Sequence, residues 1–201
     1  MGDPKFQRKN YQNPPHPWQL DRIQNENDYL MYYGLKNKKE FWKVRSSLRT
    51  IRGQARNLQA RLRYGDKQAK IEMDNLINKL KNQGYLMGEE LTLDDVLNLT
   101  IENILNRRLQ TLVYNKGLAR SPKQARQFIT HGHIKVGERR INIPGYIVRR
   151  EEEQEIGYYK HSPLTDELHP ERMEEEMESV PIQERMRKDK EKQRYSRRRR
   201  R

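Results

Sequence analysis

The stretch "SPKQARQFITHGHIKVGERRINIPGYIV", residues 121–148, contains the clearest folding signals in the chain. Ser121 is suited to cap a helix, Pro122 to fill its first position, Gln124 to complete a capping box and Gly132 to end the helix. After Gly132 the apolar period changes from that of a helix to that of a strand, and the dipeptide "GE" favours a two-residue hairpin turn. The stretch therefore predicts a short helix followed by a small antiparallel sheet.

The residues just upstream predict a second short helix that ends at Gly117. Its apolar positions share one face, and its basic and amide side chains lie off that face. The apolar set is Leu105, Leu109, Leu112 and Val113, and the polar set is Arg107, Arg108 and Gln110. Residues 104–160 are therefore expected to form a unit of two short helices packed on a small antiparallel sheet, with basic and amide side chains outside.

Residues 19–103 predict a helical subdomain. Helices are expected over about 19–33, from an N-cap at Asn37 to about residue 64, and over 66–83, and Thr92 is expected to cap a further short helix. The long second helix has a narrow apolar stripe at Phe41, Val44, Leu48, Ile51, Ala55, Leu58 and Leu62. The third is expected to turn Ile71, Leu76, Ile77 and Leu80 inward.

The two ends of the chain have the composition of tails. Residues 1–18 contain "NPPHPW", which predicts an extended arm whose end is anchored by Trp18. Residues 161–201 form a charged tail that we expect to become ordered on a partner. The predicted fold class is thus α+β: an N-terminal helical subdomain, a small domain of two helices on a short sheet, and extended terminal tails.

Composition points to a polyanionic partner. The chain has 201 residues, a net charge of +14, 33% hydrophobic residues and no cysteine. The positive charge is concentrated in two blocks, +7 over residues 1–57 and +9 over 101–150. No apolar run is long enough to span a bilayer, and the N-terminus lacks the apolar core of a signal peptide, so an intracellular soluble protein without disulfides is expected. Nucleic acid is the first partner to consider.

Four arginines should share one face of the long second helix, since they recur at intervals of four, three and four residues. They are Arg45, Arg49, Arg52 and Arg56. A charged helix face is usually only solvated. Here, however, the sequence from Lys43 to Arg63 contains no acidic residue, and unpaired arginines repel one another unless a polyanion neutralises them.

The helix that begins after Ser121 offers a second anion site. Its first turn exposes unpaired backbone N–H groups, and Arg120, Lys123 and Arg126 cluster there, so we expect a phosphate close to it. RNA is favoured over duplex DNA, because short helices with scattered basic and amide side chains suit irregular sugar-phosphate shapes and no long recognition helix is evident.

His131 and His133 have the spacing of a metal-binding pair on a strand, but Gly132 ends a helix between them and no third ligand is evident. A capping or core role remains open beside the favoured one, that of RNA-facing donors. Asp94 and Asp95 are adjacent carboxylates in the first turn of a helix, where capping is favoured over acid-base catalysis.

The segment "RRLQTLVYNKGLARSPKQARQFITHGHIKVGERRINIPGYIV" resembles the S-four RNA-binding domain. Upstream, "HPWQLDRIQNENDYLMYYGLKNKKEFW" and "LTLDDVLNLTIENILNRRLQTLVY" resemble the archaeal and eukaryotic branch of the small ribosomal subunit protein four family. The resemblance implies a protein that binds the 5′ domain of small-subunit ribosomal RNA early in assembly, beside the subunit's fifth protein. By matching positions, the resemblance puts these residues on or beside the RNA face: Arg107, Arg108, Gln110, Ser121, Lys123, Arg126, Gln127, His131, His133 and Lys135.

The candidate RNA-binding set is completed by the four arginines of the long helix and by Lys116, Arg120, Arg139 and Arg140.

The sequence departs from the family pattern at two places. Gly137-Glu138 replaces the common Asn-Gly at the hairpin tip, and "REEEQEIGYY" leaves the position of the last strand open. Some bacterial relatives hold zinc through N-terminal cysteines, and because this chain has none we predict no such site.

The expected function is therefore a non-enzymatic structural constituent of the small ribosomal subunit in the cytoplasm, which binds ribosomal RNA and neighbouring ribosomal proteins. No cofactor, membrane, small-molecule substrate or homo-oligomer is expected. Two alternatives stay open. An RNA-modifying enzyme would need a catalytic domain that residues 1–100 do not provide, and a nucleolar assembly factor that binds a guide RNA would share the same domain.

Overall fold

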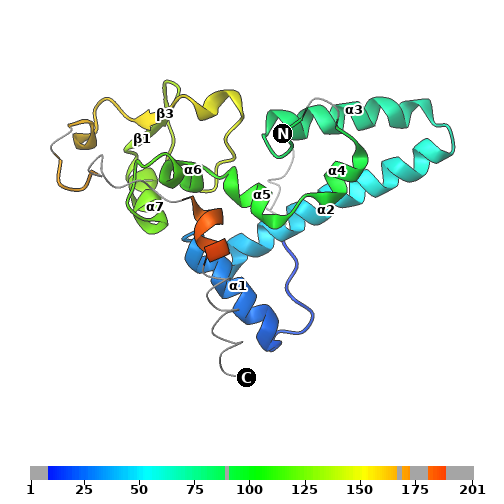
Figure 1. The fold of residues 1–201 in the computed structure, drawn as a ribbon, viewed down its shortest axis with the longest axis horizontal. Helices are drawn as coiled ribbons and strands as arrows, with labels where there is room; N and C mark the ends of the chain where they lie inside the picture. Colours follow the sequence, from blue (N-terminus) through cyan, green and yellow to red (C-terminus); the bar gives the residue numbers. More distant parts are fainter. Residues whose placement is uncertain (1–8, 89–90, 167–168, 173–180, 189–201) are drawn as a thin grey trace, which may run out of the picture.

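The computed structural model describes residues 9–88, 91–166, 169–172 and 181–188, and it has the predicted α+β architecture. A helical hairpin extends to one side of the molecule and a small domain with a three-stranded sheet lies on the other (Figure 1). The α-helices are α1 (Leu20–Tyr32), α2 (Lys38–Arg63), α3 (Lys67–Asn82), α4 (Leu93–Asn98), α5 (Ile101–Asn106), α6 (Leu109–Asn115) and α7 (Pro122–His131). The strands are β1 (Ile134–Val136), β2 (Arg139–Arg140) and β3 (Ile156–Tyr158).

Helix α2 begins and ends as the sequence predicts. The Asn37 side chain accepts a hydrogen bond from the Glu40 N–H at 3.2 Å, which caps the first turn. Five residues of the predicted stripe are buried and Ile51 and Leu62 pack against them at partial exposure. The stripe contacts α1, α3, α4 and α5, so α2 is a bundle helix.

Helix α3 is capped by Asp66 as predicted, with its carboxylate accepting from the Gln68 N–H at 2.9 Å. The predicted inner face is partly wrong, because Ile71 is 55% exposed. Leu76 and Leu80 do pack inward as predicted, and the buried face is completed by Ala69 and Met73, whose spacing keeps them on the side that packs on α2. Because α3 has apolar residues on two sides, its own sequence does not determine which side faces the core. The packing against α2 determines it.

The single helix predicted from residue 104 is broken into α5 and α6. Arg107 and Arg108 leave the helix, and their backbone pairs with the segment that follows Pro144. The Arg107 carbonyl accepts from the Val148 N–H at 3.0 Å, and an isolated bridge joins Arg108 to Ile147. The residues "YIV" therefore pair with the α5–α6 junction and lie outside the sheet.

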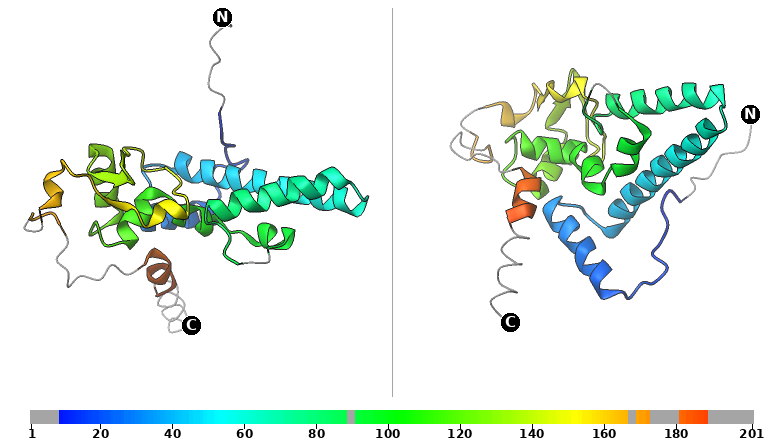
Figure 2. Two further views of the ribbon diagram at one scale, coloured as in Figure 1. Left: turned by 90° about the horizontal axis from the view of Figure 1, so that it is seen from above. Right: turned by 45° about the vertical axis from the view of Figure 1, so that its right-hand side comes forward.

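The sheet has the order β2-β1-β3 and is antiparallel throughout. Val136 pairs with Arg139 across the predicted two-residue turn, and Gly137 has the positive φ of +61° that such a turn requires. The strand that the sequence left open is β3, in which Ile156 pairs with Val136. Helices α6 and α7 pack together beside this sheet (Figures 1 and 2).

Both predicted tails differ from expectation where the structure describes them. Trp18 is 90% exposed and anchors nothing within the described residues, while Arg22 donates to the His16 and Pro17 carbonyls and so holds that end of the arm. Beyond residue 160, three apolar side chains are buried in the core: Leu164, Ile182 and Met186. The tail predicted from residue 161 therefore contributes to the folded domain.

In the described ranges, no helix has the length and hydropathy of a membrane span.

Candidate nucleic-acid interface

One long face of α2 is basic. Arg45, Arg49 and Arg56 are exposed, as the spacing predicts. Arg52 differs, because it is half-buried and donates to the Leu99 carbonyl at 2.5 Å, which ties α2 to α4. Arg63 continues the same face seven residues after Arg56 and is exposed, and helical spacing could have identified it. We call Arg45, Arg49, Arg52, Arg56 and Arg63 the α2 arginine face.

The N-terminal arm crosses this face without cancelling its charge. The Arg49 guanidinium donates to the Gln12 side-chain oxygen, and the Gln12 N–H donates to the Ser46 hydroxyl at 3.3 Å. Tyr11 packs on the Trp42 ring with centroids 6.0 Å apart. Over residues 9–88, 91–166, 169–172 and 181–188, no carboxylate lies within ion-pair distance of the α2 arginine face.

Arg107, Arg108 and Gln110 do not project from the surface as predicted. They are 5%, 6% and 1% exposed and bind groups of this chain. Arg107 forms an ion pair with Glu153 at 2.5 Å and donates to the Val148 carbonyl at 3.0 Å. The reason is the break between α5 and α6, which turns these side chains inward.

A second ion cluster joins the helical subdomain to the small domain. Glu40, in the first turn of α2, accepts from Arg108 at 2.8 Å and from Arg126 of α7 at 2.5 Å. Burial alone would raise the pKa of Glu40, but the hydrogen bonds and charges of the two arginines hold it below its usual value. Arg126, predicted to bind phosphate, therefore neutralises a carboxylate of its own chain.

Gln110 completes this junction. Its side-chain amide donates to the carbonyls of Tyr33, Gly34 and Pro122 at 3.2, 2.9 and 2.7 Å. Gly34 ends the α1 segment at a φ of +59°, and a Cβ there would lie 2.8 Å from the Gln110 nitrogen, so a larger residue would separate the two subdomains. Gln110 thus acts as a clamp between α1, α6 and α7.

The predicted phosphate site at the start of α7 is contacted by the chain itself. Ser121 caps the helix by accepting from the Gln124 N–H at 3.2 Å, while Gln124 reaches back to the Arg120 N–H, one residue before the predicted capping-box partner. The Arg120 guanidinium donates to the carbonyls of Pro170 and Arg172, each at 3.0 Å. Lys123 is exposed, so the three expected cations do not converge on one point.

The two histidines have separate environments. His131 ends α7 and is exposed, whereas the His133 Nδ1 lies 2.9 Å from the Ser162 hydroxyl. Burial lowers the pKa of His133, and the neighbouring charges of His131 and Arg140 act in the same direction. His133 is partly buried and hydrogen-bonded to Ser162, so its contacts favour a structural role within the chain.

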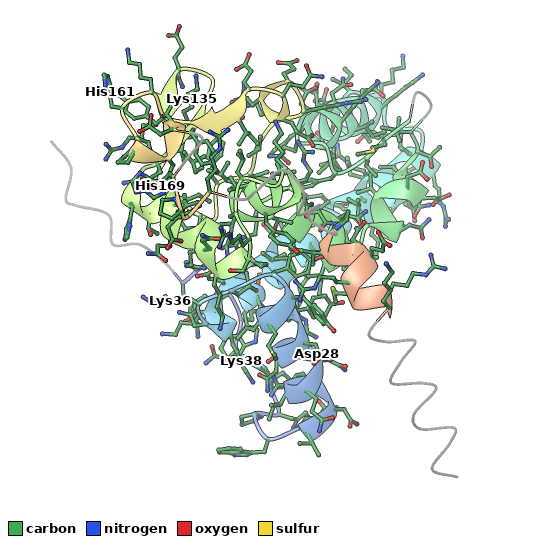
Figure 3. All side chains as sticks on the ribbon, turned by 60° about the vertical axis from the view of Figure 1, so that its left-hand side comes forward. Asp28, Lys36, Lys38, Lys135, His161 and His169 are labelled. Atoms are coloured by element: carbon green, nitrogen blue, oxygen red, sulfur yellow. The ribbon has the colours of Figure 1, made fainter. Side chains whose placement is uncertain are left out.

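The hairpin carries the second basic surface. Arg139 and Arg140 are exposed on β2, Lys135 is half-exposed on β1, and the exposed His131 lies beside His133, with ring centroids 6.0 Å apart. We call these four residues the hairpin patch. Figure 3 shows Lys135 and His161 near the sheet, and Lys36 and Lys38 at the start of α2. Two other candidates, Gln127 and Lys116, are also exposed. The Lys116 Nζ donates to the Gln154 carbonyl.

The adjacent carboxylates Asp94 and Asp95 lie in the first turn of α4. Asp95 accepts from the Thr92 backbone N–H at 2.9 Å, and this hydrogen bond lowers the pKa of the Asp95 carboxyl. The capping role predicted for this position is confirmed. No cluster of three or more potential metal ligands occurs among the described residues.

The known proteins that this chain resembles are small-subunit ribosomal proteins. A family model described as the S4 domain matches residues 107–153. Small ribosomal subunit protein uS4 of Picrophilus torridus is 56% identical over 174 residues, which cover 87% of this chain and 94% of the relative. The protein of the same name from Thermoplasma volcanium is 53% identical over 170 residues, covering 85% and 84%. The one from Methanococcus aeolicus is 51% identical over 172 residues, covering 86% and 96%. With half of the aligned residues identical along most of its length, this chain belongs to the uS4 family of small-subunit ribosomal proteins.

Proposed function

We propose that this protein binds small-subunit ribosomal RNA directly through the α2 arginine face and the hairpin patch, and that this contact helps to nucleate assembly of the subunit. Membership of the uS4 family supports a ribosomal structural role. The 5′ domain of the RNA is the proposed target. The observation that carries the proposal is the exposure of Arg45, Arg49, Arg56 and Arg63 on one helix face without an acidic partner among the described residues.

Geometry supports a long backbone contact. The exposed arginines follow one another at intervals of four, seven and seven residues, so successive side chains are about 6 to 10 Å apart along the helix axis and the face is about 27 Å long. Guanidinium groups suit phosphate oxygens because they offer several N–H donors in a fixed plane. The hairpin patch would hold the same RNA at a second position, and the two surfaces are fixed relative to one another by the Glu40 cluster.

Residues that the sequence placed on the RNA face now divide into two groups. The exposed ones and the half-exposed Lys135 are proposed RNA ligands: Arg45, Arg49, Arg56, Lys116, Lys123, Gln127, His131, Lys135, Arg139 and Arg140. Arg63, which the structure adds to the α2 arginine face, joins this group. The others hold the fold that presents them: Arg52, Arg107, Arg108, Gln110, Ser121, Arg126 and His133. Arg120 is exposed but already binds two backbone carbonyls, so it belongs with the second group.

A salt titration with the 5′-domain RNA tests the proposal. Each neutralised phosphate contributes about 0.7 to 0.9 to the slope of log affinity against log salt. The double variant Arg45→Ala/Arg56→Ala should therefore lower the slope by about 1.4 to 1.8. The matched control Lys70→Ala/Lys79→Ala removes the same charge from exposed positions of α3 and should leave the slope unchanged. Equal slopes for both variants would contradict a specific role for α2.

The cellular role is tested separately. We propose a non-enzymatic protein of the cytoplasmic small subunit that contacts neighbouring ribosomal proteins, including the fifth protein, and that is monomeric before assembly. It should sediment stoichiometrically with mature small subunits in high-salt gradients. If the protein occurred only in precursor particles, the assembly-factor alternative would be favoured instead. No contact among the described residues favours that alternative over the ribosomal role.

A further inference from the structure

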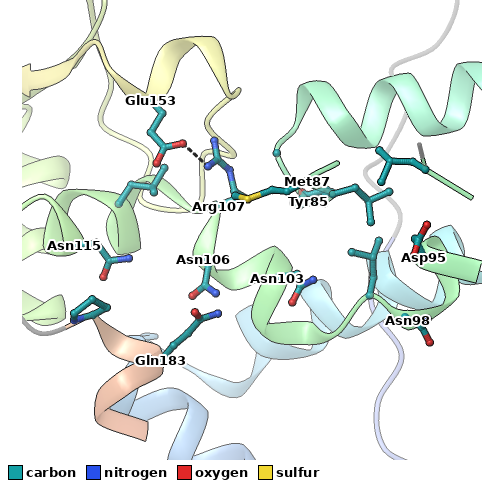
Figure 4. A pocket seen from close by; sticks show the side chains of 16 residues that line it. Tyr85, Met87, Asp95, Asn98, Asn103, Asn106, Arg107, Asn115, Glu153 and Gln183 are labelled. Atoms are coloured by element: carbon teal, nitrogen blue, oxygen red, sulfur yellow. Dashed lines mark hydrogen bonds and ion pairs between the residues drawn. The ribbon is translucent and has the colours of Figure 1, made fainter. Parts of the chain in front are cut away.

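A cleft of about 600 Å³ lies on the molecule between the end of α3, the helices α4, α5 and α6, and the segment at residues 181–183 (Figure 4). Of the RNA-binding residues that the sequence predicts, Arg107 alone lines it, and Arg107 is already paired with Glu153. Its size falls within the usual range of about 300 to 1,000 Å³ for sites that enclose a ligand. The cleft therefore requires an explanation apart from the basic surfaces.

Carboxamide side chains from four parts of the chain line this cleft. They are Asn98, Asn103, Asn106, Asn115 and Gln183. Two of them are held in one orientation: Asn103 Oδ1 accepts from the Thr100 hydroxyl at 2.7 Å and Asn106 Oδ1 accepts from the Tyr33 hydroxyl at 3.1 Å. With each oxygen bound, the NH2 group is the part of each amide that can donate to a ligand.

The lining of the cleft combines apolar side chains with more carboxylates than cations. Leu86 and Leu91 line it, and Met87 is 77% exposed at its edge. Arg107 is the cation in the lining and is already paired with Glu153 (Figure 4), while Asp95 adds a second carboxylate. Two carboxylates and one guanidinium disfavour the phosphates that accompany any nucleotide, whereas the α2 arginine face attracts them.

We infer that this cleft, here called the amide cleft, binds an extended, uncharged peptide segment of a neighbouring small-subunit protein. The backbone carbonyls of such a segment accept from the NH2 groups of Asn103 and Asn106, and its apolar side chains pack on Leu86, Met87 and Leu91. Amide donors suit a peptide because its carbonyls recur at regular intervals and need partners when buried. The inference rests on the proposed ribosomal function, since the partner is supplied by the assembled subunit.

A photocrosslinking experiment tests the inference in the full-length protein. Met87→p-benzoylphenylalanine places a photoreactive ring at the edge of the amide cleft. After incorporation into purified small subunits and irradiation, the link should map by mass spectrometry to one short segment of one ribosomal protein. The double variant Asn103→Asp/Asn106→Asp keeps both oxygen acceptors but removes the donors, and should lower the crosslink yield at least about ten-fold.

The substitution Asn75→Asp is the matched control, because Asn75 is an exposed asparagine on α3 that does not line the amide cleft. Its crosslink yield should equal that of the protein without an Asp substitution. A link from position 87 to RNA, or no link in subunits that contain the protein, would overturn the inference. Failure of the protein to enter subunits, measured by sedimentation, would count against the proposed function instead, so the two failures are distinguishable.

Discussion

Arginines at two places in this molecule have opposite environments. On α2, Arg45, Arg49 and Arg56 are exposed and have no carboxylate partner among the described residues. At the α5–α6 junction, Arg107 and Arg108 are buried and bind Glu153 and Glu40. The residue type is the same and the local sequence is basic in both places. The difference teaches that the position of acidic residues distant in sequence decides whether an arginine is bound within the protein or stays available at its surface.

The largest expected loss of stability follows from removing the carboxylate of the ion cluster at the junction. Glu40→Ala leaves the buried Arg108 without its carboxylate and should lower the free energy of unfolding by about 3 to 5 kcal/mol, measured by urea denaturation. Glu72→Gln is the control, because Glu72 also binds an arginine but the pair is exposed on both sides. A similar loss of stability in both variants would remove the distinction between buried and exposed pairs.

The second largest loss of stability is expected at Arg107, which donates to the segment after Pro144. Arg107→Ala leaves the buried Val148 carbonyl without its side-chain donor and should cost about 1 to 3 kcal/mol of unfolding free energy. If this variant melted normally but bound RNA poorly, Arg107 would belong with the RNA ligands as the sequence first indicated.

The third prediction follows from the lowered pKa of Glu40. Because its folded pKa lies below the unfolded value of 4.5, the stability that its ionised form contributes is complete above pH 4.5 and is lost as pH falls through the folded pKa. The difference in unfolding free energy between the unmodified protein and Glu40→Gln should therefore shrink as pH is lowered from about 7 to about 3. A constant difference over this range would show that the ionised carboxylate does not stabilise the junction.

The smallest expected effect on stability is on the α2 arginine face. Arg45→Ala/Arg56→Ala removes two exposed side chains from a helix that its apolar stripe holds in place, so the unfolding free energy should change by less than about 0.5 kcal/mol. Calorimetry on the variant that shows the reduced salt slope provides this measurement. A large loss of stability would mean that the arginines also hold the fold.

Local patterns were sufficient for much of this fold. The caps at Asn37, Asp66 and Ser121, the apolar stripe of α2 and the hairpin at Gly137 all depend on residues a few positions apart, and the structure has each of them. The same spacing located the α2 arginine face. These features follow from the sequence because helical and strand periodicity are properties of neighbouring residues.

The tertiary structure alone decided which polar residues are inside. The break between α5 and α6 and the burial of Gln110 depend on contacts between segments far apart in the sequence, and nothing in the charged composition of the C-terminal residues predicts the burial of Ile182. It also assembled the amide cleft from asparagines that look unremarkable in sequence. The physical reason is that a basic or amide side chain is stable either in water or beside a buried partner, and only the fold determines whether that partner is present.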